Sequence, residues 1–136
     1  MPQELILVIN PGNTSTKVAV YNGALPVCAA SIKHADEELA RFPDINSQKA
    51  FREELILAFL RDQAIATGAI QAVAARGGLL KPLASGTYVV DRKMIDDLVA
   101  ARQGSHASNL AAQIGLSIAD KLGLTCYIVD PVSVDE

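Results

Sequence analysis

The sequence predicts an α/β fold whose mixed sheet begins with three antiparallel strands. Short strand-like segments separated by tight turns open the chain, and strand-like and helix-like segments alternate after them. Strands separated by a helix pair in parallel, because the helix carries the chain back across the sheet. We therefore expect an antiparallel meander followed by crossover helices and parallel strands.

The opening meander is predicted from three segments and the turns between them. Residues 5–10 are short, branched and apolar, which is typical of a buried strand, and residues 15–21 alternate between two faces. Residues 25–32 supply the third strand. The sequence Pro-Gly-Asn at 11–13 predicts the first turn, and Asn-Gly at 22–23 predicts the second because both residue types tolerate positive φ.

The rest of the chain is predicted to alternate between helices and strands. Apolar residues recur at helical spacing in three segments, and short branched segments lie between them. Gly123 is expected to end the last helix, since glycine just past the final turn adopts left-handed φ easily. The expected helices cover residues 47–66, a segment capped by Asp91 and residues 107–122, and the expected strands cover residues 72–75, 87–90 and 125–129.

Composition indicates an ordinary globular domain. Hydrophobic residues make up 50% of the 136 residues and charged residues 20%, so we expect a single domain over residues 1–136. The net charge of −3 and the lack of a basic run argue against nucleic acid as a partner. No apolar run approaches the roughly 20 residues of a spanning helix, which argues against a membrane. Cys28 and Cys126 are expected to be reduced core residues.

Three polar residues are expected to meet at one edge of the sheet. Asn10, Arg76 and Asp130 each lie at the end of a predicted strand. In such sheets, ligands collect outside the carboxyl ends of the strands. The shared position is the first indication of a binding site.

The turn after the first strand has the composition of a phosphate-binding loop. Gly12 lets the backbone turn tightly and approach a ligand. Asn13, Thr14 and Ser15 offer donors in a row, and Lys17 adds a positive charge. The segment is not a Walker loop, because it lacks the second glycine and the following helix. A polar turn without a ligand is the alternative interpretation.

Arg76, His106 and Asp130 each allow a functional and a structural interpretation. The planar guanidinium of Arg76 suits a carboxylate or a phosphate, but a surface salt bridge would also explain it. His106 stands at an expected helix start, where it either donates to an anion or belongs to a capping segment. Asp130 either holds Mg²⁺ or forms an Asp-Pro turn. The apolar residues within 79–83 would suit a short fatty acid, or they simply pack down.

Four sequence blocks together resemble the acetate, propionate and butyrate kinase family of the sugar-kinase, Hsp70 and actin superfamily. They follow the family's order and span nearly the whole chain. The run Gly-Gly-Leu-Leu-Lys-Pro-Leu at 77–83 favours butyrate kinases over acetate kinases. The blocks are residues 8–12 with 14–17, 75–83, 106–110, and 128–132 with 134–136.

The resemblance implies a ribonuclease H-like, actin-like ATPase domain. The reaction would be the ATP-dependent phosphorylation of a short-chain fatty acid, butyrate or similar, to an acyl phosphate, with Mg²⁺ as cofactor. Asn13 departs from the family pattern, which has serine or threonine there, so its role is open. The implied roles are phosphate or nucleotide binding for Gly12, Asn13, Thr14, Ser15 and Lys17, substrate binding and catalysis for Arg76 and His106, catalysis for Asp130, and metal binding for Asn10 and Asp130.

The implied chemistry needs no base. The substrate carboxylate is already ionised at neutral pH, so Asp130 is expected to position Mg²⁺ rather than to remove a proton. Arg76, Lys17, the metal and the loop amides would reduce the repulsion between two anions.

Members of this superfamily have two similar domains with the nucleotide between them. We therefore expect this chain to be the amino-terminal domain of a two-domain acyl kinase, without its second domain and inactive alone. The full-length protein would be cytoplasmic and homo-oligomeric, with its own carboxy-terminal domain as a partner. A non-catalytic sensor or scaffold domain is the main alternative. An activator-type ATPase or glycoside kinase is disfavoured by the apolar block that follows Arg76.

Overall fold

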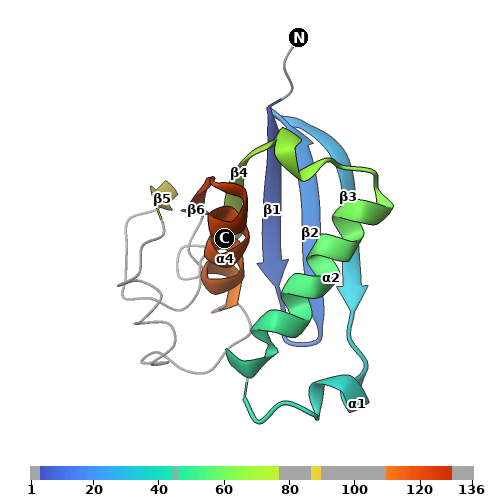
Figure 1. Cartoon of the computed structure of the whole chain (residues 1–136). Coiled ribbons are helices and arrows are strands. Elements are labelled where there is room, and N and C mark those ends of the chain that lie inside the picture. The colour runs from blue at the N-terminus through green and yellow to red at the C-terminus, as the bar shows by residue number, and fades with distance from the viewer. Residues whose placement is uncertain (1–3, 45, 77–86, 90–109, 130–136) are drawn as a thin grey trace.

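The computed structural model describes residues 4–44, 46–76, 87–89 and 110–129, which form a six-stranded mixed sheet with helices against it (Figure 1). The strands lie in the order β3-β2-β1-β4-β6-β5. They are β1 (Leu5–Pro11), β2 (Ser15–Asn22), β3 (Leu25–Lys33), β4 (Ile70–Arg76), β5 (Thr87–Val89) and β6 (Thr125–Val129). The helices are α1 (Asp36–Leu39), α2 (Lys49–Asp62) and α4 (Leu110–Leu122), with the short 3₁₀ helices η1 (Asn46–Gln48) and η2 (Thr67–Ala69).

The expected antiparallel meander is confirmed. β1 pairs antiparallel with β2, and β2 pairs antiparallel with β3. The second turn lies one residue later than expected, because Asn22 pairs with Leu25 and leaves Gly23 and Ala24 as the loop. Gly23 has the positive φ (60°) that the turn needs. Asn22 is held in β2, since its Oδ1 accepts a hydrogen bond from the Glu4 N–H at 3.0 Å.

The later strands are parallel with one exception. β4 runs parallel to β1 and to β6, as expected, whereas β5 pairs antiparallel with β6, so the expectation is wrong for β5. Val129 pairs with Arg76 on one side and with Thr87 on the other, so residues 77–86 connect two points at the same edge of the sheet. This connection is shorter than the roughly dozen residues of a crossover, and the chain therefore returns in the opposite direction.

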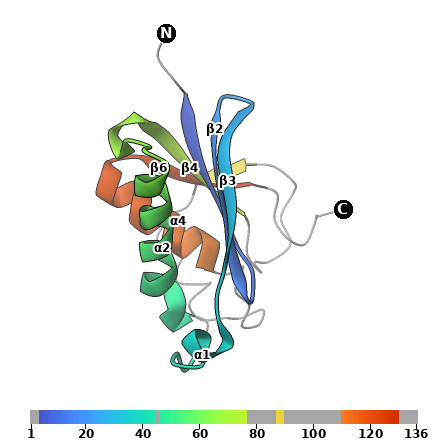
Figure 2. The ribbon, with the colours of Figure 1, turned by 90° about the vertical axis from the view of Figure 1, so that its right-hand side faces the viewer.

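Both long helices cover the same face of the sheet. α2 and α4 lie on one side of the strands in two perpendicular views (Figures 1 and 2). α4 approaches the sheet closely, because a Cβ added to Gly115 would meet Cys126 Sγ at 2.6 Å. No helix among the described residues covers the opposite face (Figure 2). The core includes Leu7, Ile9, Val20, Ile56, Leu60, Ile114 and Ile128, which are fully buried.

The two long helices end with the same backbone geometry but different residues. α2 ends at Asp62 rather than at residue 66, because Ala64 adopts a φ of 57° and the Ile65 N–H donates to Leu60 O at 2.9 Å. α4 ends, as expected, at Gly123, which has a φ of 71°. The expected helix after Asp91 and the expected start of α4 at residue 107 lie outside the described residues.

The cysteines and the character of the helices complete the description of the fold. Cys126 is buried, Cys28 is half-buried and neither is in a disulfide. Among the helices that the structure describes, none has the length and apolar character needed to cross a membrane.

Candidate functional site

The carboxyl ends of β1, β4 and β6 meet at one edge of the sheet, as the sequence predicts. Ile9 of β1 pairs with Ala75 of β4. Arg76, the next residue of β4, pairs with Val129 of β6. Continuing the parallel register by one position places Asn10 beside Arg76. Asn10, Arg76 and Val129 therefore lie in one row across the sheet.

Lys17 extends this row on the other side of β1. It pairs with Asn10 across the β1–β2 hairpin. Asn10 is half-buried and Lys17 is exposed, and both alternate with the buried residues of their strands, so they lie on the face of the sheet opposite the core. For Arg76 only the strand position is described, and His106 and Asp130 lie outside the described residues. The structure thus brings Asn10, Lys17 and the Arg76 position together, while the roles of all the expected site residues stay predictions.

The β1–β2 loop consists of Gly12, Asn13 and Thr14. It closes through the Gly12 N–H, which donates to Ser15 O at 2.7 Å, and Asn13 and Thr14 are exposed at its tip. The φ of Gly12 is not positive, and a Cβ there would lie 3.6 Å from Ser15 O, an ordinary contact. The turn itself therefore does not require glycine, and the expected role of Gly12 in the approach of a ligand stays a prediction.

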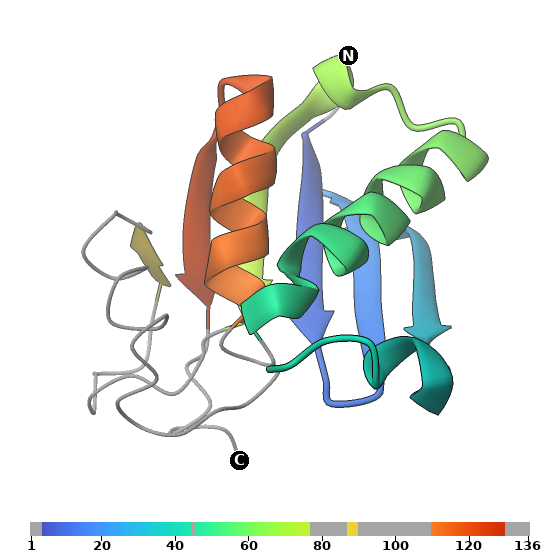
Figure 3. The same cartoon turned by 60° about the horizontal axis from the view of Figure 1, so that its bottom comes forward.

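A buried arginine, Arg52, holds this loop from the side of α2, whose first turn lies beside the loop (Figure 3). Arg52 is 0% exposed. Its Nη1 donates to Gly12 O at 2.7 Å and to Ser15 O at 3.0 Å, and its Nη2 donates to Asn13 O at 3.1 Å. Three backbone carbonyls of the hairpin thus point at one guanidinium.

The other hydrogen bonds of Arg52 go to polar side chains. Nε and Nη2 donate to Gln48 Oε1 at 3.1 and 2.8 Å, and Nη1 also donates to Thr16 Oγ1 at 3.2 Å. All of these acceptors are uncharged. Burial lowers the pKa of Arg52 to about 10, which leaves the side chain charged at neutral pH. The guanidinium is a buried charge that carbonyl and hydroxyl dipoles stabilise.

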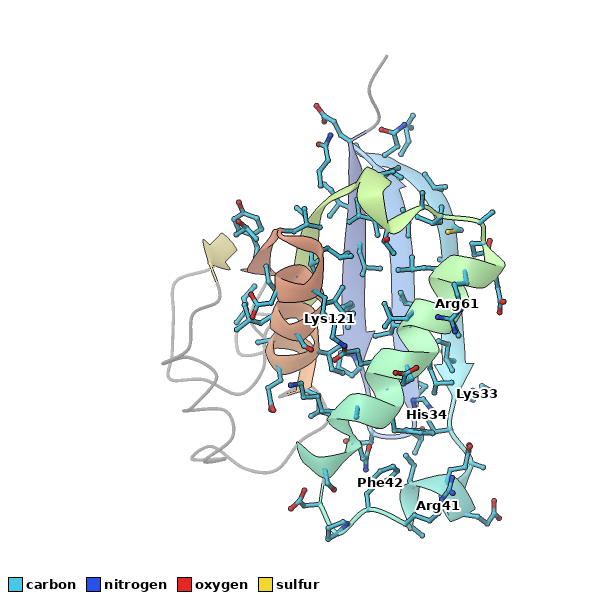
Figure 4. The ribbon with its side chains drawn as sticks, viewed as in Figure 1. Lys33, His34, Arg41, Phe42, Arg61 and Lys121 are labelled. Atoms are coloured by element: carbon cyan, nitrogen blue, oxygen red, sulfur yellow. The ribbon has the colours of Figure 1, made fainter. Side chains whose placement is uncertain are left out.

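His34 supports the same loop from the end of β3. The backbone N–H of His34 donates to Thr14 O at 2.9 Å, and Nε2 of its ring lies 2.8 Å from Thr16 Oγ1. The ring lies between α2 and the end of β3 (Figure 4) and packs on Phe51, with ring centroids 5.3 Å apart. Burial first, and then the charge of Arg52, lower the pKa of His34. We call this set the Arg52 network: Arg52, Gln48, Thr16 and His34.

The Arg52 network was not predicted from the sequence, although one signal for it was present. Arg52 stands four residues before Ile56 and seven before Phe59, on the stripe that α2 buries. A charged residue in a buried stripe needs polar partners. Those partners could not be named from local spacing, because Gly12 lies 40 residues before Arg52 in the chain.

The expected metal site is only partly within the described residues. In that part of the chain, no group of three or more His, Cys, Asp or Glu side chains could hold a metal ion. Asn10 offers an amide oxygen, a type of ligand that Mg²⁺ accepts. The carboxylate expected beside it, Asp130, lies outside the described residues. The described residues therefore include one of the two ligands expected for Mg²⁺, and its amide oxygen is of a suitable type.

Solved structures define the fold to which this arrangement belongs. An acetate kinase from Entamoeba histolytica superposes with a TM-score of 0.60 at 16% sequence identity, and a propionate kinase from Francisella tularensis superposes with a TM-score of 0.51 at 14% identity. Each comparison covers 93% of this chain and 36% of the solved chain. At this identity the likeness shows the fold alone. The chain has the ribonuclease H-like fold of actin-like ATPases, which confirms the expected fold class.

Sequence comparison gives a narrower relationship. Over 131 residues, the chain is 47% identical to butyrate kinase 2 and 44% identical to butyrate kinase 1 of Clostridium acetobutylicum, and 45% identical to a probable butyrate kinase of Listeria monocytogenes. The chain is a homologue of butyrate kinases, as its motifs predict. Each match covers 96% of this chain but 37% of the relative, so the chain spans little more than a third of their length. No protein-family model matches the chain.

Proposed function

We propose that this chain is the amino-terminal domain of a two-domain acyl kinase that phosphorylates a short-chain fatty acid, butyrate or similar, with ATP. The observation that carries the proposal is the row of Lys17, Asn10 and Arg76 at the sheet edge where the β1–β2 loop begins. Polar and cationic residues gathered at the carboxyl ends of strands are suited to a phosphorylated ligand. Homology to butyrate kinases supports the choice of a carboxylate as phosphoryl acceptor.

In the proposed reaction, a carboxylate oxygen of the fatty acid forms a bond to the γ-phosphorus of ATP. The bond from that phosphorus to the β–γ bridging oxygen breaks, and its electron pair leaves with ADP. The products are an acyl phosphate and ADP. No proton has to be removed, because the carboxylate is ionised at neutral pH. The main barrier is therefore the repulsion between two anions, which positioned cations and dipoles reduce.

The residues of the row would divide this task. Lys17 would neutralise charge on the transferred phosphoryl group, and the amides of Asn13 and Thr14 would donate to its oxygens. Arg76 would hold the substrate carboxylate, and His106 would lie beside the reacting groups. When bound, Mg²⁺ supplies further neutralisation, and Asn10 and Asp130 are the residues proposed to hold it. The adenosine pocket would come from a carboxy-terminal domain, and the full-length protein would be a cytoplasmic homo-oligomer.

A chimera tests this proposal. The chain replaces the matched stretch of butyrate kinase 2 of Clostridium acetobutylicum, and acyl phosphate is trapped with hydroxylamine in the presence of butyrate and MgATP. We expect acyl phosphate from the chimera and none from the 136-residue chain alone. Lys17→Ala should abolish the signal, whereas Arg61→Ala should keep it, because Arg61 is an exposed cation in the last turn of α2, at the end of the helix away from the loop.

Three outcomes would contradict the proposal. A chimera that folds, as judged by circular dichroism, but forms no acyl phosphate would indicate a non-catalytic sensor or scaffold domain. Equal activity in Lys17→Ala and Arg61→Ala would show that the row does not handle the phosphoryl group. Acyl phosphate formation by the 136-residue chain alone would show that no second domain is needed.

A further inference from the structure

We propose that Arg52 is a positioning residue that turns the backbone amides of the β1–β2 loop toward a phosphate group. Arg52 would not touch the ligand and would act through the loop. The identity of the ligand rests on the proposed kinase function, whereas the orientation of the amides follows from the hydrogen bonds of the hairpin.

Peptide geometry links the carbonyls that Arg52 binds to the amides on the other side of the loop. A trans peptide group is planar, and its C=O and N–H point in opposite directions. The described residues contain no cis peptide bond. Gly12 O and Asn13 O both point at Arg52, at 2.7 and 3.1 Å. The N–H groups of Asn13 and Thr14 belong to the same two peptide groups and therefore point away from Arg52.

Neither of these amides has an acceptor among the described residues. Asn13 and Thr14 are both exposed, so the two N–H groups are available to a ligand. Successive backbone N–H groups on one side of a turn form a concave site that suits an anion. Lys17, three residues beyond Thr14, adds a positive charge at the same end of the hairpin.

The Arg52 network also removes the groups that would repel an anion. A carbonyl oxygen carries partial negative charge and would disfavour a phosphate if it faced the site. Arg52 binds the carbonyls of Gly12, Asn13 and Ser15, and the backbone N–H of His34 binds that of Thr14. The loop is thereby held with its carbonyls occupied, and two of its amides have no acceptor in the described part of the chain. Donors that are already oriented need no rearrangement when the ligand binds or reacts.

The test measures anion binding by the folded 136-residue chain. If Arg52 only stabilised the fold, a folded Arg52 variant would bind the anion as tightly as the wild type. Inorganic triphosphate is titrated into the ¹⁵N-labelled chain, and the amide resonances of Asn13 and Thr14 are followed by NMR. Saturable shifts are expected in the wild type. Arg52→Met keeps the length of the side chain but removes its donors, and binding about tenfold weaker is expected. The matched control, Arg61→Met, changes an exposed arginine of α2 and should bind like the wild type.

Conservative substitution separates charge from geometry. Arg52→Lys keeps a positive charge but cannot bridge Gly12 O and Asn13 O as a planar fork does, so it should also bind more weakly than the wild type. If Arg52→Met does not fold, as judged by circular dichroism, Arg52→Lys decides the question by the same titration. Equal triphosphate affinity in a folded Arg52 variant and the wild type would overturn the proposal. The absence of saturable shifts at Asn13 and Thr14 in the wild type would overturn it as well.

The two proposals of function and positioning can fail separately. Triphosphate binding that depends on Arg52, together with an inactive chimera, would leave the positioning role intact and remove the kinase proposal. An active chimera whose Arg52→Met variant keeps the wild-type kcat and KM for ATP would remove only the positioning role.

Discussion

α2 and α4 cover the same face of the sheet but contact it with different kinds of residues. α4 packs mainly with apolar and small residues, of which Leu110, Ala111, Ala112, Ile114, Ile118 and Ala119 are fully buried, and Gln113 is its buried polar residue. α2 buries Ile56, Phe59 and Leu60, but it also buries Arg52 and Glu53. Glu53 forms an ion pair with Lys121 of α4, which joins the two helices.

This difference indicates that α4 contributes mainly to packing of the core, whereas α2 also holds the β1–β2 loop. α4 lies against β4 and β6 and packs closely enough that Gly115 has no room for a side chain. α2 contributes the Arg52 network, whose acceptors lie in the β1–β2 hairpin. Substitutions in α4 should therefore change stability and leave the loop unchanged, whereas substitutions at Arg52 should change both.

The largest effect on stability is expected from Arg52→Met. The substitution leaves three hairpin carbonyls and the Gln48 amide without their donor, and it should lower the free energy of unfolding by about 3 kcal/mol. Urea unfolding followed by circular dichroism measures it. Arg61→Met, on the exposed side of the same helix, should stay within about 0.5 kcal/mol of the wild type. Equal losses in the two variants would mean that burial of Arg52 has no special role in the fold.

A smaller effect is expected from Gly115→Ala in α4. The new methyl group would meet Cys126 Sγ at 2.6 Å and Ala75 Cβ at 3.4 Å, so the free energy of unfolding should fall by about 1–3 kcal/mol. Triphosphate binding by the folded variant should be unchanged, which would sharpen the contrast with Arg52→Met. Thermal or urea unfolding, with the NMR titration described above, checks both expectations.

Two further variants test the physical cause at Gly115. Gly68→Ala is the matched control, because a Cβ there would meet nothing within 4 Å and little loss is expected. In a Cys126→Ala background the clash with Sγ is gone, and Gly115→Ala should then cost much less, since alanine favours helix more than glycine. An unchanged cost in that background would place the strain at Ala75 or Val73 instead.

The contrast between the helices also explains what the sequence could and could not predict about the fold. The strands β1, β2, β3 and β6 and the end of α4 follow from local patterns, namely alternation, branched apolar residues and a terminal glycine. The end of α2 was missed because Ala64 adopts left-handed φ without a glycine to mark it. The direction of β5 was missed because it depends on a short connection rather than on its own residues.

The candidate site likewise has a part that the sequence predicts and a part that it does not. Asn10 and Arg76 could be brought together from the sequence, because each ends a strand and parallel strands end at one edge. Arg52 could not be connected to the site, since the backbone carbonyls that it binds belong to residues 37 to 40 positions earlier in the chain. Backbone carbonyls carry no sequence signal, so a side chain that binds them can be found only from the arrangement in space.

The two helix ends offer a third test, with an expected gain in stability. Ala64 after α2 and Gly123 after α4 have nearly the same φ, 57° and 71°, but only glycine adopts it without steric cost. Ala64→Gly should therefore raise the free energy of unfolding by about 0.5–1 kcal/mol, measured by urea unfolding. Ala66→Gly is the control, because Ala66 has a φ of −70° and glycine there should only add entropy to the unfolded chain. A gain at Ala66 equal to that at Ala64 would exclude backbone strain as the cause.

The smallest effect is expected from the titration of His34, which belongs to the Arg52 network and has no counterpart in α4. Desolvation, and then the charge of Arg52, lower the pKa of His34 below its ordinary value of 6.5, and Glu38 partly opposes them. The unfolded chain therefore takes up a proton at His34 more readily than the folded chain does. The free energy of unfolding should fall as the pH drops below about 6.5, and this contribution should level off below the folded pKa.

The free energy of unfolding in urea, measured at several pH values between about 7.5 and 5, gives this slope. His34→Gln removes the titrating ring and should flatten the profile relative to the wild type. Glu38→Gln removes the carboxylate that favours the charged ring, so its profile should continue to fall to lower pH than that of the wild type. Other carboxylates contribute equally to all three proteins and cancel in the comparison. A wild-type slope that survives in His34→Gln would show that the network beneath the loop is insensitive to pH, as the apolar contacts of α4 are expected to be.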